Sequence, residues 1–157
     1  MITEMPFGLN GKVIRSPMPF SQYDVSQDVW SDYLENGINL VLVLVEDDEL
    51  LVKSGRDLLK FYNTGGVEFI HYPIPDFETP MNIKTLDGVI DEVISRSENG
   101  DNIAVHCLAG IGRTGLFMAC MAKRYFQISG QEAIGWVRKS LPCAMENLIQ
   151  EDFVLDF

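Results

Sequence analysis

The segment from residue 103 to residue 126 constrains the fold more than any other part of the chain. Ile103 to His106 is a short apolar run with the features of a buried strand. A turn with Gly110 and Gly112 follows, and Arg113 to Phe126 has the apolar content of a well-buried helix. A strand that passes through a tight turn into a helix is typical of sheets with parallel strands, so we expect an α/β fold.

The rest of the chain repeats this alternation. Strands are predicted at residues 12–15, 38–45, 67–74 and 103–106. Helices are predicted from residue 24 or 26 to residue 36, and at residues 50–62, 83–97, 113–126, 129–139 and 146–157. The pattern predicts a single domain over residues 1–157. Its central, largely parallel sheet should have about four to five strands, with helices on both faces.

The charge balance limits the classes of partner. The chain has 12 basic and 23 acidic residues, a formal net charge of −11. Such a surface repels nucleic acid and anionic membranes, so we expect neither as a partner. The four consecutive acids Glu46 to Glu49 are interpreted as a solvated loop that leads into a helix N-terminus.

Cysteine and histidine usage argues against a disulfide framework and against a metal centre. Three cysteines is an odd number, and no C-x-x-C pair is present. With only two histidines, no metal and no other cofactor are expected. Residues 1–4 lack a signal-peptide pattern and no apolar run reaches the roughly 20 residues of a membrane helix, so a cytoplasmic location is expected.

The turn between the strand and the helix has the properties of an anion site. Backbone N–H groups can curl around one anion there, at the helix N-terminus. They belong to Leu108, Ala109, Gly110, Ile111, Gly112 and Arg113. The guanidinium of Arg113 adds a planar fork for two phosphate oxygens. The same positive field favours the thiolate form of Cys107, so anion binding and activation of a nucleophile share one cause.

Two residues that flank this turn are expected to support it. Thr114 is predicted to donate its hydroxyl hydrogen to the Cys107 sulfur and so to help the sulfur leave as a thiolate. The ring of His106 is predicted to anchor the loop backbone, which we favour over a role in proton transfer. Both predictions place the chemistry on Cys107 and its immediate neighbours.

The run His-Cys-x5-Arg-Thr-Gly, residues 106–115, resembles the signature of the protein tyrosine phosphatase superfamily. Its form Ala-Gly-x-Gly-Arg-Thr-Gly resembles the small dual-specificity branch of that superfamily. The resemblance extends over residues 38–157 and is weak outside the loops. It implies the cysteine-phosphatase fold and hydrolysis of phosphate monoesters through a phosphocysteine on Cys107.

The resemblance also implies a general acid on a loop before the nucleophile. Residues 72–80 form a proline-bracketed segment similar to the acid loop of the small dual-specificity enzymes, and Asp76 is the matching aspartate. A carboxylic acid there would protonate the leaving oxygen of the ester and, once ionised, could act as the base for the water of the second step. Glu78 is the alternative acid, and the alternative role for Asp76 is capping of the turn.

Near the C-terminus, residues 146–151 resemble the element that holds the attacking water in the second step. Gln150 is the matching residue. Many relatives carry Arg-Pro-Gly-Ser before this element, whereas this chain has Leu-Pro-Cys-Ala-Met at residues 141–145. The other interpretation of Gln150 is a polar residue on the exposed face of the last helix.

The variable positions of the loop bear on the substrate. Phosphoinositide phosphatases of the superfamily tend to carry basic residues there, whereas Leu108 and Ile111 are apolar. We therefore favour phosphotyrosine in a protein or peptide, with phosphoserine and phosphothreonine as further substrates, and we expect a monomer. The alternatives are a phosphatase of phosphoinositides or RNA 5′-phosphates, and a pseudophosphatase that binds phosphate without turnover.

Overall fold

The computed structural model describes all residues from 1 to 157 and contains one five-stranded sheet. The strands are β1 (Thr3–Glu4), β2 (Val13–Ser16), β3 (Ile38–Val43), β4 (Glu68–His71) and β5 (Asn102–His106). Their order across the sheet is β1-β2-β5-β3-β4. Only β1 and β2 pair antiparallel, so the prediction of a largely parallel α/β sheet is confirmed.

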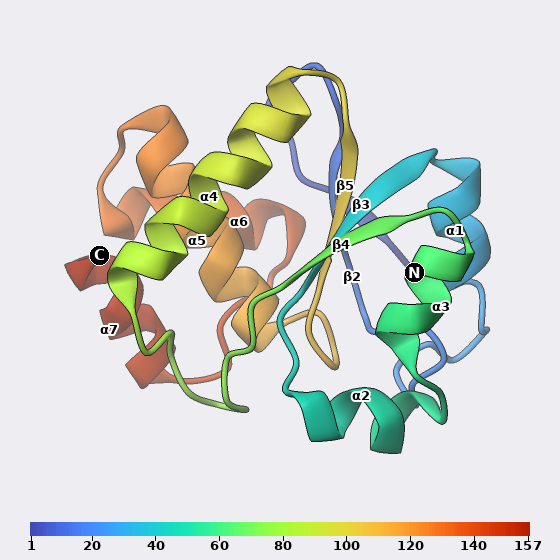
Figure 1. The fold of residues 1–157 in the computed structure, drawn as a ribbon. Helices are drawn as coiled ribbons and strands as arrows, with labels where there is room; N and C mark the ends of the chain where they lie inside the picture. Colours follow the sequence, from blue (N-terminus) through green and yellow to red (C-terminus); the bar gives the residue numbers. More distant parts are fainter.

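Helices cover both faces of this sheet, as predicted. They are α1 (Val29–Glu35), α2 (Asp47–Ser54), α3 (Leu58–Thr64), α4 (Ile83–Glu98), α5 (Gly112–Phe126), α6 (Gly130–Ser140) and α7 (Leu148–Asp156). Figure 1 shows α4, α5, α6 and α7 on one side of the sheet and α1 and α3 on the other. No helix combines the length and the apolar character needed to cross a membrane.

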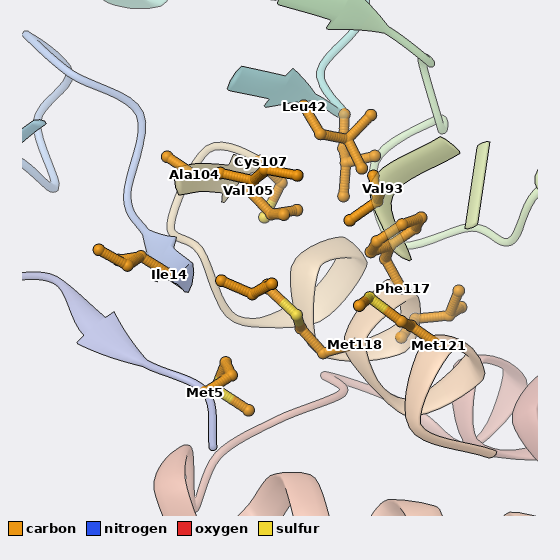
Figure 2. Packing of buried hydrophobic residues seen from close by; sticks show 14 of the residues in the cluster. Met5, Ile14, Leu42, Val93, Ala104, Val105, Cys107, Phe117, Met118 and Met121 are labelled. Atoms are coloured by element: carbon orange, nitrogen blue, oxygen red, sulfur yellow. The ribbon is translucent and has the colours of Figure 1, made fainter. Parts of the chain in front are cut away.

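The apolar core continues from the sheet onto α5. Figure 2 shows Phe117 and Met118 of α5 close to Val105 of β5, within one continuous cluster of buried side chains. Every residue of α5 from Gly112 to Ala122 is buried, because α6 and α7 cover the helix on its other side. Burial of a large apolar side chain contributes roughly 1.5–3 kcal/mol, so the start of α5 is firmly held against the sheet.

The segment between β3 and β4 differs from its prediction. The sequence predicts one helix over residues 50–62, whereas the structure has two, α2 and α3. Gly55 ends α2 with a left-handed φ of 72°, a conformation that glycine adopts without steric cost. Helix α2 also starts earlier than predicted, because Glu46 and Glu49 form a reciprocal capping box at its N-terminus.

Two other helices start at least two residues later than predicted. Asp24 does not begin α1: its carboxylate accepts hydrogen bonds from the N–H groups of Phe20 (2.9 Å) and Val29 (3.3 Å), and so holds the preceding turn. The last helix begins at Leu148, because the side chain of Asn147 caps it by accepting a hydrogen bond from the N–H of Gln150, the third residue of the helix.

The strand order decides where a ligand site can form. The carboxyl ends of β2, β5, β3 and β4 lie at one edge of the sheet because these strands are parallel. Ligands of parallel sheets bind beyond that edge. β5 is the central strand of the five, so the loop that follows it is flanked by the segments that follow β2 and β3.

Candidate active site

The loop between β5 and α5 packs directly on the end of β2. Gly110 has a left-handed φ of +73°, and a Cβ atom at this position would lie 2.1 Å from the carbonyl oxygen of Ser16. Met18, two residues further on, donates its N–H to the carbonyl oxygen of Leu108 (3.0 Å). Only glycine fits at position 110, and the loop is held on this side by the chain that leaves β2.

The other side of the loop is held by the segment between α6 and α7. The N–H of Met145 donates to the carbonyl oxygen of Ile111 (3.4 Å). A Cβ atom on Gly115 would lie 2.9 Å from the Cβ of Ala144, which explains why the first turn of α5 needs a small residue there. The loop is therefore fixed from two sides, in the arrangement expected of a preformed anion site.

Cys107 is the first residue after β5 and lies at the N-terminal end of α5. Its side chain is buried, and Figure 2 shows its sulfur next to Val105 at the margin of the apolar cluster. The N-terminus of a helix stabilises a nearby negative charge. The position of Cys107 therefore suits a thiolate nucleophile.

The neutral ring of His106 anchors the backbone of the loop at Cys107. Its Nδ1 lies 3.0 Å from the carbonyl oxygen of Cys107, and its Nε2 lies 2.9 Å from the hydroxyl of Tyr62. A carbonyl oxygen only accepts, so Nδ1 carries the hydrogen and Nε2 accepts one from Tyr62. Complete burial lowers the pKa of His106 from 6.5 to about 4, which agrees with a structural role.

This neutral histidine predicts a loss of stability in acid. Above pH 6.5 the ring is neutral in both the folded and the unfolded chain. Between pH 6.5 and about pH 4 the ring is protonated in the unfolded chain but stays neutral in the folded one, so the unfolded chain is favoured. His106 should therefore lower the free energy of unfolding by up to about 3 kcal/mol over this range. Urea unfolding at several pH values measures it.

Two glutamine variants separate this effect from general acid sensitivity. His106→Gln should show a shallower decline in stability between pH 6.5 and pH 4 than the wild type. His71→Gln is the control, since His71 is only partly buried and its Nε2 donates to the carbonyl oxygen of Val45 (2.8 Å). An equally steep decline in His106→Gln would contradict the assignment.

Arg113 connects the loop to two other segments. Its side chain is only 1% exposed. Nη1 donates to Glu49 Oε2 (2.6 Å) and to the carbonyl oxygen of Ile74 (3.1 Å), and Nη2 donates to Glu49 Oε1 (2.9 Å). Nη2 is also 3.1 Å from Asp76 Oδ1, whereas the buried Nε has no partner. The guanidinium is thus oriented by two carboxylates and keeps one free donor.

The prediction that residues 46–49 are solvated is wrong for Glu49. Asp47 and Asp48 are exposed, but the Glu49 side chain is only 13% exposed and forms a two-pronged ion pair with Arg113. Burial alone would raise the pKa of Glu49, but the hydrogen bonds from Arg113 lower that pKa to below its ordinary value. No sequence pattern links the two residues: they meet because β3 and β5 are neighbours and end at the same edge.

Glu49→Gln should destabilise the protein, because a buried guanidinium would lose its carboxylate. We expect a loss of about 3 kcal/mol in the free energy of unfolding, measured by urea denaturation at pH 7. The matched control is Glu68→Gln, which removes a carboxylate from the exposed pair with Arg96 and should cost less than about 1 kcal/mol. Equal losses in both variants would contradict the structural role of Glu49.

Asp76 lies on the loop after β4, as predicted, and faces the same site. The N–H of Glu78 donates to the carbonyl oxygen of Pro75 (3.0 Å), and Phe77 has a left-handed φ of 59° in this turn. Asp76 Oδ1 contacts Arg113 and accepts a hydrogen bond from the N–H of Phe77 (3.2 Å). The structure therefore brings together Cys107, Arg113 and Asp76.

Gln150 and Thr114 are placed less simply. Gln150 is fully buried rather than on an exposed helix face. Its Oε1 accepts from the N–H of Glu146 (2.9 Å), and its Nε2 donates to the carbonyl oxygen of Glu78 (3.4 Å), so the amide joins α7 to the acid loop. The Thr114 hydroxyl is buried without any hydrogen-bond partner, so the predicted bond to Cys107 is not formed in this structure.

These segments enclose a small pocket of about 40 Å³. It is lined by Tyr23, Asp76, Phe77, Cys107, Leu108, Ala109, Arg113 and Glu146. Arg113 is the single cation in this lining, and Glu146 is a residue that sequence reasoning had missed. A larger depression of about 380 Å³ lies elsewhere, lined by parts of α4, α5 and the C-terminus, and it contains no nucleophile.

Comparison with known proteins identifies relatives of this chain. The family model Tc-R-P, described as "polymorphic toxin system, DSP-PTPase phosphatase", matches residues 19–126. Cyclin-dependent kinase inhibitor 3 of Rattus norvegicus is 32% identical over 119 residues, which is 73% of this chain and 56% of that protein. The chain spans 20% of the length of dual specificity protein phosphatase CDC14C of Homo sapiens and 27% of that of CDC14B of Mus musculus, so it covers only part of these relatives.

Two solved structures extend the likeness to nearly the whole chain. Kinase associated phosphatase, with serine at its catalytic-site cysteine, superposes with a TM-score of 0.88 over 100% of this chain and 93% of that one. At 22% identity this match concerns the fold alone. A glycine-to-alanine variant of Tk-PTP is 31% identical, with a TM-score of 0.73 over 92% of this chain and 87% of that one.

Proposed function

Because this chain belongs to the dual-specificity phosphatases of the protein tyrosine phosphatase superfamily, we propose that it hydrolyses phosphate monoesters on Cys107. The observation that carries the proposal is the meeting of Cys107, Arg113 and Asp76 in one pocket at the start of α5. A nucleophile, a phosphate-binding cation and a carboxylic acid are the groups that such a hydrolysis needs.

In the first step the Cys107 thiolate attacks phosphorus. The S–P bond forms, the bond from phosphorus to the ester oxygen breaks, and Asp76 supplies the proton that the leaving oxygen takes. The backbone N–H groups of the loop and the free Nε of Arg113 bind the phosphoryl oxygens. Because Glu49 already orients the guanidinium, this binding needs little rearrangement of the arginine.

In the second step water hydrolyses the phosphocysteine. The water oxygen bonds to phosphorus, the S–P bond breaks, and the electron pair returns to the Cys107 sulfur. A carboxylate of the pocket takes the proton of the water. We propose that Thr114, one residue after Arg113, donates a hydrogen bond to the departing sulfur by rotation of its unpartnered hydroxyl.

The lining of the pocket favours a substrate with a single phosphate group. Asp76 and Glu146 stand beside the one cation, so an additional phosphate would meet negative charge rather than a second arginine. Tyr23 and Phe77 are partly exposed at the pocket and offer aromatic surface to a substrate ring. These features support phosphotyrosine in a protein or peptide, with phosphoserine and phosphothreonine as further substrates, over phosphoinositides and RNA 5′-phosphates.

Turnover of p-nitrophenyl phosphate tests the proposal. The wild type should release nitrophenol, and Cys107→Ser should lower the rate by at least about a thousandfold, since the nucleophile is lost. The variant should still bind vanadate in a thermal-shift measurement, because the loop remains. A wild type that binds phosphotyrosine peptide without turnover would instead identify a pseudophosphatase. Higher kcat/KM on phosphoinositide or on RNA 5′-phosphate would contradict the preferred substrate.

The role of Asp76 is tested through the leaving group. Asp76→Asn should lower kcat by roughly a hundredfold or more for alkyl phosphates and phenyl phosphate, whose leaving oxygens need a proton. The loss should shrink for esters of acidic phenols, which leave without one. Glu78→Gln, the alternative acid in the same turn, provides the comparison. Equal losses for good and poor leaving groups would rule out Asp76 as the acid.

A further inference from the structure

Glu146 is the one charged residue of the pocket that has no role in the proposed first step. It lies in the segment between α6 and α7, and its carboxylate is pressed against the loop. A Cβ atom on Gly112 would lie 2.1 Å from Glu146 Oε2 and 2.6 Å from its Cδ. The carboxylate therefore stands at the wall of the anion cradle, in the same pocket as Cys107.

The carboxylate of Glu146 is free to bind a water molecule. No ion pair or hydrogen bond engages its oxygens, and the residue keeps access to solvent although the pocket wall partly buries it. Asp76 is occupied by contrast, because one oxygen already meets Arg113 Nη2 and the N–H of Phe77. Both ends of the Gln150 amide are also occupied, and Gln150 does not line the pocket. Glu146 is thus the carboxylate of the pocket with both oxygens unengaged.

Partial burial, together with the charges that face it, makes Glu146 a stronger base than an ordinary glutamate. Asp76 faces it from the acid loop, Arg113 from α5, Cys107 from the phosphate loop and Tyr23 from the segment after β2. Burial, and then the negative charge of Asp76, raise the pKa of Glu146, while Arg113 acts in the opposite direction. A raised pKa moves a carboxylate toward the range in which general bases work near neutral pH.

We propose that Glu146 binds and deprotonates the water that hydrolyses the phosphocysteine, an inference that rests on the proposed phosphatase function. The water oxygen forms its bond to phosphorus while one of its hydrogens passes to the Glu146 carboxylate. The S–P bond breaks, and its electron pair remains on Cys107 as the thiolate. The proton on Glu146 leaves to solvent when inorganic phosphate departs, and Asp76 takes up from solvent the proton that it gave in the first step.

The surrounding contacts give Gln150 a positioning role in this step. Its Oε1 holds the N–H of Glu146, and Asn147 donates its side-chain N–H to the carbonyl oxygen of Phe77 (2.8 Å). The backbone of Glu146 is therefore tied to the acid loop, and through Met145 to the phosphate loop. Water-binding geometry is set by α7, although the proton acceptor is Glu146.

Rapid-quench kinetics with p-nitrophenyl phosphate tests the inference. Glu146→Ala should release a burst of nitrophenol equal to the enzyme concentration, followed by turnover at least tenfold slower than in the wild type, because the second step slows. Phosphoenzyme trapped by acid quench should accumulate. Glu146→Gln should also accumulate phosphoenzyme, and its hydrolysis should lose the rise with pH that the titrating carboxylate produces in the wild type.

Asp152→Asn is the matched control, an exposed carboxylate on α7 outside the pocket, and it should behave like the wild type. Wild-type burst and turnover in Glu146→Ala would overturn the inference. Wild-type rate and pH dependence in Glu146→Gln would overturn the proton transfer. Accumulation of phosphoenzyme in Gln150→Ala, but not in Glu146→Ala, would show that Gln150 rather than Glu146 binds the water. Failure of the proposed function is distinct, since the wild type itself would then show no nitrophenol.

Discussion

The ion pairs of the buried Arg113 guanidinium are the interactions on which the active-site half of the molecule depends. A buried cation must be paired, and Arg113 finds Glu49 on α2, the Ile74 carbonyl after β4 and Asp76 on the acid loop. Two segments that are remote in sequence, α2 and the loop after β4, are thereby held around the loop of Cys107. The pairing requires β3, β4 and β5 to end at the same edge, which their parallel arrangement provides.

The same arginine links stability to chemistry. Glu49 takes two of its donors and holds the guanidinium plane, which leaves Nε for a phosphoryl oxygen. Asp76 shares Nη2, so the proposed acid and the proposed phosphate-binding group are already adjacent in this structure. One cation is thus grouped closely with three carboxylates, those of Asp76, Glu49 and Glu146.

The candidate site was predictable where its residues are adjacent in sequence. Cys107, the glycines of the loop and Arg113 form one continuous run between a strand and a helix, so their chemistry follows from local spacing. Asp76 was found by its proline-bracketed turn. Glu49 and Glu146 were missed because nothing in their local sequence distinguishes a carboxylate that turns inward from one on a solvated surface. Gln150 was selected as a residue type, but its amide is used to join α7 to the acid loop.

The sequence by itself determined the α/β class, the positions of the buried strands and the phosphate loop, because hydrophobic periodicity and glycine placement act over a few neighbouring residues. Tertiary structure alone decided the strand order and the partners of each charge. Ion pairs and hydrogen bonds depend on distances of about 3 Å between groups that are far apart along the chain. Only the packed sheet, which ends β3, β4 and β5 side by side, brings Glu49, Asp76 and Arg113 to such distances.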